Sequence, residues 1–183
     1  ITTIFLYTNY LTGTISSVFN STSITSIQLR YNLFTGSISN IISNTKALYE
    51  LSLSHNLLTG TIPAPLGDLP LLGYVDIYMN YLTGSIPSFT QAISLIAIEL
   101  QYNRLTGTLD EIFNVSQQLY LNTIVLNNNQ LTGTLPGNLF SSHSLKVFVV
   151  NTNCLQGSLP KELCNAPSLE SLVLDGLNSA KQC

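Results

Sequence analysis

Two carboxylates stand 23 residues apart and are the first candidates for acid–base chemistry, because neighbouring carboxyl groups can share a proton or flank a glycosidic bond. They are Asp76 and Glu99. Two solvated acids are the simpler interpretation of this pair. The histidines, His55 and His143, have no acid and nucleophile arranged around them in the sequence, which disfavours a catalytic triad or a metal site. We therefore predict no catalytic residue, no metal and no cofactor.

A sequence repeat supplies the elements that must position these side chains. Seven segments, among them "HNLLTGTIP" and "MNYLTGSIP", place an Asn at spacings of 23, 24, 24, 23, 26 and 24, with a Gly four residues after each. Apolar residues precede each Asn by three and five positions, which is the alternation of a strand with one buried face. Such strands bury their apolar faces only by stacking into a parallel sheet. The repeated asparagines, expected to form a structural ladder, are Asn9, Asn32, Asn56, Asn80, Asn103, Asn129 and Asn153.

This pattern resembles the leucine-rich repeat family, in particular the 24-residue type of plant and algal extracellular proteins, with the consensus LxxLxLxxNxLTGxIP. The resemblance implies an α/β solenoid of about eight turns. A parallel β-sheet would form its concave face, and irregular or 3-10 segments its convex face. One domain would cover residues 1–183, with repeats over 1–153 and a C-terminal capping region over 154–183.

Two departures from the regular repeat carry their own expectations. The chain starts within a turn, at "ITTIFLYTNY", whereas secreted members of the family begin with a cysteine-bearing cap. We therefore expect an N-terminal cap to be absent and the first layer to be uncovered. The spacing of 26 between Asn103 and Asn129 predicts a bulge in the outer loop near "NVSQQLYLN", with the sheet passing it unbroken.

Function is expected at the variable positions of the sheet face, which lie four, two and one residues before each ladder Asn. The first five turns combine aromatic side chains with a few charges there, a composition typical of recognition surfaces. The ligand-binding candidates are Tyr7, Arg30, Tyr31, His55, Asp76, Tyr78, Met79, Glu99, Gln101 and Tyr102. The last three turns present Val125, Val149 and Val173 beside Asn127 and Asn151. Tyrosine and valine also suit strands that bind nothing, so a purely structural origin stays open.

Three cysteines and two sequons point to an oxidising, extracellular compartment. The cysteines, Cys154, Cys164 and Cys183, lie within the last thirty residues, where they would staple a terminal cap; buried free thiols are the alternative. Two pairings remain open, Cys164 with Cys183, which we favour, and Cys154 with Cys183. The sequons "NST" at Asn20 and "NVS" at Asn114 each lie seven residues after a repeat Gly, on the expected outer side, and predict glycans at both sites.

Composition narrows the class of function. Charged residues make up 8% of the chain, the net charge is −3, and the six Lys and Arg are scattered, which disfavours a nucleic-acid partner. No run approaches the roughly 18 apolar residues of a transmembrane segment. The resemblance implies a non-enzymatic extracellular module that binds a protein, peptide or glycan on its tyrosine-rich concave face, as in receptor-like ectodomains and polygalacturonase-inhibiting proteins. The alternative is a structural glycoprotein subunit of a cell-surface or fibre-like assembly, with self-assembly or an upstream segment covering the first turn.

Overall fold

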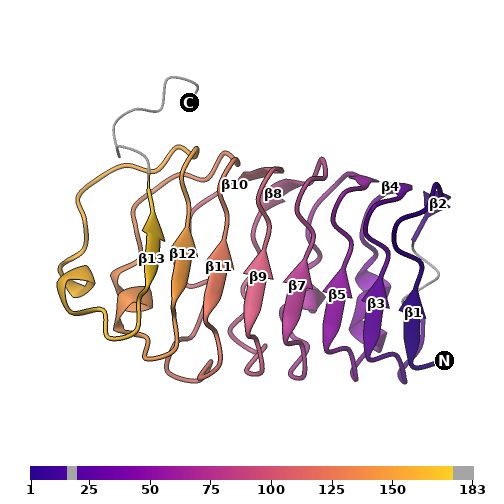
Figure 1. Ribbon diagram of the computed structural model, residues 1–183, viewed down its shortest axis with the longest axis horizontal. Coiled ribbons are helices and arrows are strands. Elements are labelled where there is room, and N and C mark those ends of the chain that lie inside the picture. The colour runs from indigo at the N-terminus through magenta and orange to yellow at the C-terminus, as the bar shows by residue number, and fades with distance from the viewer. Residues whose placement is uncertain (16–19, 175–183) are drawn as a thin grey trace.

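The chain winds into a solenoid whose strands stack side by side, as the computed structural model shows for the described residues, 1–15 and 20–174 (Figure 1). Eight parallel strands follow one another in chain order in a single sheet, so that seven full turns lie between the first strand and the last. The strands are β1 (Thr3–Phe5), β3 (Ser26–Gln28), β5 (Glu50–Ser52), β7 (Tyr74–Asp76), β9 (Ala97–Glu99), β11 (Thr123–Val125), β12 (Val147–Val149) and β13 (Ser171–Val173). The predicted fold class is confirmed.

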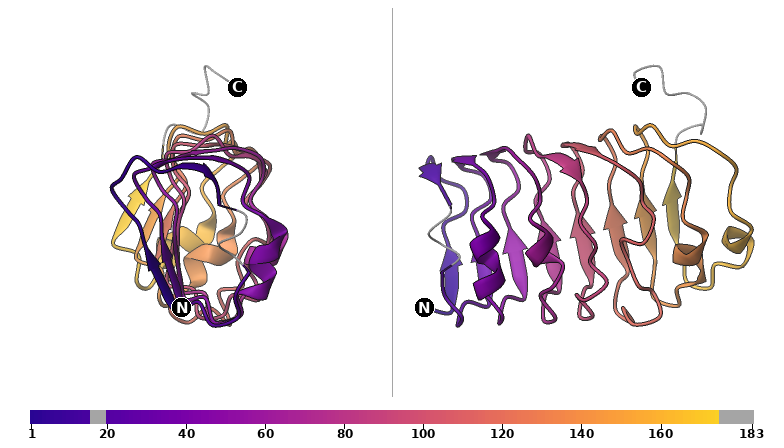
Figure 2. Two further views of the ribbon diagram at one scale, coloured as in Figure 1. Left: turned by 90° about the vertical axis from the view of Figure 1, so that its right-hand side faces the viewer. Right: turned by 180° about the vertical axis from the view of Figure 1, so that it is seen from behind.

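The opposite side of the solenoid carries short 3-10 helices, which the end-on view separates clearly from the sheet (Figure 2). Pro63 precedes one of them, Pro136 and Pro160 two others, and each of these prolines adopts extended backbone angles before the helical turn begins. The helices are η2 (Asn40–Asn44), η3 (Ala64–Leu66), η4 (Gly137–Ser141) and η5 (Lys161–Asn165). No helix in ranges 1–15 and 20–174 is long and apolar enough to cross a membrane.

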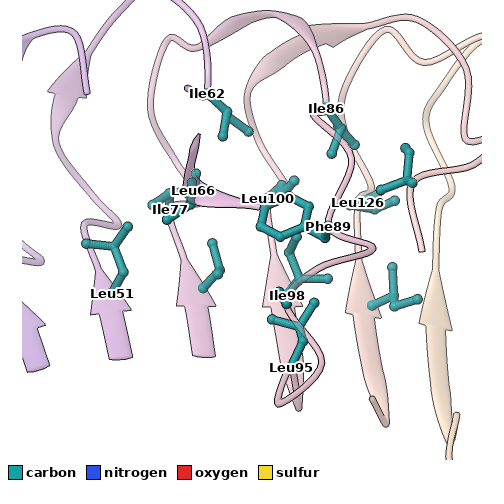
Figure 3. Packing of buried hydrophobic residues seen from close by; sticks show 14 of the residues in the cluster. Leu51, Ile62, Leu66, Ile77, Ile86, Phe89, Leu95, Ile98, Leu100 and Leu126 are labelled. Carbon is teal, nitrogen blue, oxygen red and sulfur yellow. The ribbon is translucent and has the colours of Figure 1, made fainter. Parts of the chain in front are cut away.

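The core lies between these two sides and runs the length of the solenoid. Leu51 and Ile98 enter it from the sheet, and Leu66 and Phe89 enter it from the convex side, all four without exposed surface (Figure 3). Each turn contributes the same kinds of apolar side chain, so the burial of one turn depends on its two neighbours.

The asparagine ladder confirms the predicted register. Asn80 is buried, and its Nδ2 donates to the carbonyl oxygens of Leu53 in the preceding turn and Ile77 in its own, at 3.1 and 3.2 Å. Its Oδ1 accepts the Leu58 N–H at 3.0 Å. One side chain thereby pairs buried backbone groups that the strands leave unpaired. The same bonds recur at Asn32, Asn56, Asn103, Asn129 and Asn153.

Asn9 does not join the ladder, contrary to our prediction. It is exposed, and its Nδ2 donates only to the carbonyl oxygens of Leu6 and Tyr7 in its own turn. No earlier turn lies against it within the described residues, so the inter-turn half of the pattern begins at Asn32, whose Nδ2 donates to the Leu6 carbonyl at 2.8 Å.

The 26-residue turn behaves as its spacing predicts. β9 and β11 remain in register across it, with Ala97 opposite Thr123. The additional residues form turns in the outer loop, which Gln118 fastens to the solenoid. This side chain is fully buried; its Nε2 donates to the carbonyl oxygens of Phe89 and Ala92 at 2.9 and 3.1 Å, and its Oε1 accepts the Asn114 N–H at 2.9 Å.

A second set of strands was not predicted. Short segments at or just before the repeat Gly of several turns pair in parallel along one flank, as a three-stranded sheet and a two-stranded sheet. Gly84 has a φ of +76°, and a Cβ there would meet Thr61 Cγ2 at 2.8 Å, which explains why glycine recurs at this step. The flanking strands are β2 (Thr12–Thr14), β4 (Leu33–Gly36), β6 (Leu57–Leu58), β8 (Thr83–Ser85) and β10 (Arg104–Thr106).

The cysteines differ from the favoured pairing. Cys154 is disulfide-bonded, whereas Cys164 is a free thiol exposed on η5. Cys183 lies outside the described residues. The expected pairing of Cys164 with Cys183 is therefore wrong in this structure, because the Cys164 side chain faces outward from the convex side. The alternative through Cys154 stays a prediction.

Candidate recognition surface

The solenoid brings the predicted site residues of the first five turns onto one continuous face. Asp76 and Glu99 are register partners in β7 and β9, as expected for equivalent positions of adjacent turns. The remaining candidates follow the ends of β1, β3, β5, β7 and β9, where the chain leaves the sheet. His143 lies apart from them, in the outer loop after η4.

The residue immediately before each ladder Asn has a left-handed backbone. Tyr31, His55, Met79 and Tyr102 have φ values of 56°, 53°, 51° and 57°. A side chain other than glycine pays about 1–2 kcal/mol for this conformation, so the tertiary structure must impose it. The sequence signal was missed, because no glycine or asparagine marks these four positions. These left-handed positions recur once per turn along the edge of the concave face.

Aromatic side chains of successive turns form what we call the aromatic patch, consisting of Tyr7, Tyr31, His55, Tyr78 and Tyr102. The Tyr31 and His55 rings stack with centroids 4.0 Å apart and planes at 17°, and the Tyr78 ring meets His55 edge-on at 5.0 Å. The Arg30 guanidinium lies over the Tyr7 ring, 5.0 Å from its centroid. Tyr31 and Tyr102 are 45% and 50% exposed. The three central rings, Tyr31, His55 and Tyr78, are thus ordered by contacts with one another, while the patch stays open to solvent.

Asp76 lies at the centre of a polar network beneath the patch. Its Oδ2 accepts hydrogen bonds from the hydroxyls of Ser52 at 2.7 Å and Ser54 at 3.1 Å. Burial raises the pKa of Asp76 above its ordinary value, and the Glu99 charge adds to the rise, while the two hydroxyls and Arg30 oppose it. Asp76 Oδ2 is thus occupied by two serine hydroxyls, whereas its Oδ1 has no hydrogen-bond partner among the described residues.

Two serines at the variable positions four and two residues before Asn56 are buried. Ser52 and Ser54 are 2% and 0% exposed. Their side chains are short, and the Asp76 carboxylate of the next turn lies over both of them. They support Asp76 and cannot themselves touch a large partner.

A further column of the face was missed by sequence analysis. It lies six residues before each ladder Asn, at the first position of each strand, and includes Glu50 and the exposed Tyr74. The Glu50 carboxylate accepts hydrogen bonds from Ser26 Oγ at 2.8 Å and from Gln28 Nε2 at 2.9 Å. The Tyr74 ring meets the Tyr49 ring edge-on at 5.5 Å. Counting the repeat back by two more residues would have found this column.

Three buried acceptor atoms on this face have no hydrogen-bond partner among the described residues. They are Asp76 Oδ1, Gln101 Oε1 and Asn151 Oδ1. Unpaired buried acceptors are uncommon in folded proteins because each costs free energy. Within ranges 1–15 and 20–174, no group of three or more His, Cys, Asp or Glu side chains is placed to hold a metal ion.

The last three turns present valine and asparagine side chains at the equivalent positions. Val125, Val149 and Val173 are register partners in β11, β12 and β13, as predicted. The first two are half-buried, and Val173 is 41% exposed. Asn127 and Asn151 stand beside them, two residues further along each chain segment. Among the described residues at these positions, the aromatic and charged side chains therefore lie in the first five turns.

Comparisons with known proteins agree with this geometry. The family profile described as "Leucine Rich Repeat" matches residues 47–69 and 120–142. Among solved structures, the plant peptide hormone receptor RGFR1, in complex with RGF2, is 30% identical with a TM-score of 0.89, over 94% of this chain and 28% of that one. A search of curated protein sequences finds no match.

Two Arabidopsis receptor kinases show how far the similarity extends. HAESA, solved with the peptide hormone IDA and the co-receptor SERK1, is 31% identical with a TM-score of 0.81, over 90% of this chain and 27% of that one. The leucine-rich repeat ectodomain of SOBIR1 is 29% identical with a TM-score of 0.58, over 67% of each chain. The chain thus spans less than a third of the length of RGFR1 and HAESA.

Proposed function

Because this chain is built of leucine-rich repeats similar to those of plant receptor ectodomains, we propose that it is a non-enzymatic extracellular recognition module. Its concave face would bind a peptide or another extended partner through the aromatic patch. The similarity to two structures that hold peptide hormones supports the choice of partner class. Protein and glycan partners are the alternatives that the experiment below separates.

The ordering of the aromatic patch is the observation that carries this proposal. Tyr31, His55 and Tyr78 already restrain one another, so a partner that covers them would lose little side-chain entropy in doing so. Tyrosine rings bury a large area and keep a hydroxyl for hydrogen bonding. Exposed, preorganised tyrosines on adjacent turns are therefore suited to act as binding hot spots.

The polar groups beside the patch favour a partner that donates hydrogen bonds. Asp76 and Glu99 place two carboxyl groups side by side, and the Asp76 and Gln101 side chains each keep one acceptor without a partner among the described residues. A cationic or hydroxyl-rich partner would satisfy them after modest side-chain rotation. We propose that these three residues set selectivity, while the tyrosines supply most of the affinity.

Extracellular location is part of the same proposal. Besides the similarity to receptor ectodomains, a disulfide-bonded Cys154 is typical of proteins from oxidising compartments. The Asn20 sequon is exposed, and the Asn114 sequon lies on the outer loop.

Selection from a displayed library of random peptides, with an oligosaccharide array in parallel, tests the proposal. The bait is the parent chain, and counter-selection uses a Tyr78→Ala/Tyr102→Ala variant. We expect peptides that the parent enriches and the double variant does not. Tyr120→Ala, which removes an exposed ring from the outer loop, is the matched control and should enrich the same peptides. Binding seen only on the oligosaccharide array would assign a glycan partner. Equal enrichment of peptides by the parent and the double variant would show that the aromatic patch is not the binding site.

A further inference from the structure

A groove on the convex side lies next to the Asn114 sequon and has no role in the proposed concave site. It has a volume of about 570 Å³, within the usual range for small-ligand sites. Phe113 forms its buried floor and is fixed by stacking on Phe89, with ring centroids 6.4 Å apart. The remaining lining is Ser88, Thr90, Glu111, Asn114, Val115, Ser116 and Asn138.

The wall of this groove is held by the preceding turn. The Phe89 N–H donates to the Ile112 carbonyl at 2.7 Å, and Ser88 Oγ donates to the Glu111 carbonyl at 3.3 Å. Glu111 has a φ of 57°, the one non-glycine left-handed residue in the described ranges that does not precede a ladder Asn. The groove is thus a built feature of the 26-residue turn.

The Asn114 side chain is oriented for modification. Its Oδ1 accepts a hydrogen bond from Ser116 Oγ at 2.6 Å, and its backbone N–H is held by Gln118. Its Nδ2 donates no hydrogen bond within ranges 1–15 and 20–174. The atom that would carry a sugar is therefore free, while the rest of the residue is fixed at the groove.

We propose that Asn114 carries an N-linked glycan and that the first sugars of this glycan lie in the groove. Attachment would occur by transfer from a lipid-linked oligosaccharyl diphosphate. The Asn114 Nδ2–C1 bond forms, the C1–O bond to the diphosphate breaks, the lipid diphosphate leaves, and the amide proton passes to a base of the host transferase. This inference rests on the extracellular part of the proposed function. It assigns the surface that binds the first sugars as well as the site of attachment.

The groove has the chemistry of a binding site for N-acetylglucosamine. The sugar has apolar ring faces, several hydroxyls and an acetamide group. Val115 and the Phe113 edge offer apolar contact, while Thr90 and Asn138 offer a hydroxyl and an amide group for hydrogen bonding. A tethered sugar meets these groups at high effective concentration, so weak individual contacts suffice to hold it.

The test uses the whole chain, secreted from a host that performs N-glycosylation. Intact mass and peptide mapping of the parent, Asn114→Gln and Asn20→Gln report attachment at each site. The rate at which an endoglycosidase cleaves within the two-sugar stem of the folded protein then reports whether the stem is docked in the groove. We expect cleavage at Asn114 to be at least about tenfold slower than in an Asn138→Trp variant, because a docked stem must leave the groove before it is cut. The Asn20 glycan should be cleaved at the same rate in both proteins.

Each outcome decides a separate part. An unmodified Asn114 would overturn the attachment. Equal cleavage rates at Asn114 in the parent and in Asn138→Trp, whether both are fast or both are slow, would overturn the groove as the seat. Peptide binding by the parent and by Asn114→Gln is measured in parallel. If both proteins bind a selected peptide but the parent carries no glycan at Asn114, this inference alone is rejected. If the parent carries the glycan in the groove but binds no peptide, the concave site alone is rejected.

Discussion

At the scale of single residues, the ladder asparagines should carry more stability than their polar character suggests. Replacing Asn80 with Ala leaves the Leu58 N–H and the carbonyls of Leu53 and Ile77 without this partner in the core. We expect the free energy of unfolding in urea to fall by about 2–4 kcal/mol, since each unpaired buried group costs about 1–3 kcal/mol. Asn127→Ala, which removes a side chain that makes no ladder bond, should stay within about 0.5 kcal/mol of the parent. Equal effects of the two substitutions would contradict the structural role of the ladder.

Asp76 gives a residue-scale prediction about pH. Its raised pKa means that the folded protein holds the proton more tightly than the unfolded chain does, so ionisation of Asp76 costs folding stability. This cost is absent at a pH below the pKa of Asp76 in the unfolded chain. It grows as the pH rises toward the pKa of Asp76 in the folded protein, and it is complete above that pKa. The stability of the parent relative to Asp76→Asn should therefore fall with rising pH through that acidic window and then level off. Urea denaturation of both proteins across the window measures it; parallel curves, or a relative gain by the parent, would refute the raised pKa.

At the scale of elements, the outer loop of the 26-residue turn should depend on Gln118. The Gln118→Ala substitution leaves the Phe89 and Ala92 carbonyls and the Asn114 N–H without their partner and opens a cavity. We expect faster amide hydrogen exchange over residues 108–121 and near-parental exchange in β9 and β11. Gln117→Ala is the matched control, because the Gln117 side chain is exposed. Exchange that rises equally along the whole sheet, or in neither variant, would show that Gln118 does not fasten the loop.

The elements also show what the sequence could and could not predict. Strand register and the outer-loop bulge were predictable because the Asn spacing fixes both. The flanking strands were not, because these two- to four-residue segments show no apolar alternation and pair only once the turns are stacked. The contacts within the aromatic patch and the burial of Ser52 and Ser54 depend on side chains from adjacent turns. Sequence position alone cannot supply that information.

At the scale of the whole molecule, the recognition proposal predicts a monomer. Light scattering of the parent should give one species near 19.9 kDa plus any glycan mass, independent of concentration. The structural-assembly alternative predicts instead a broad, concentration-dependent distribution. Leu6 on the first turn is 43% exposed, and association that disappears in Leu6→Asp while later turns stay folded would place assembly at that turn. This outcome would replace recognition as the function.

The binding free energy of a selected peptide, measured by calorimetry, tests the central claim most directly. We expect the Tyr78→Ala/Tyr102→Ala variant to lose about 2–4 kcal/mol relative to the parent, a magnitude typical of hot-spot tyrosines. Its stability should change little, because both rings lie on the concave surface, one half-buried and one exposed. Tyr120→Ala should bind like the parent. A double variant that binds within about 0.5 kcal/mol of the parent would show that the aromatic patch is not the recognition surface.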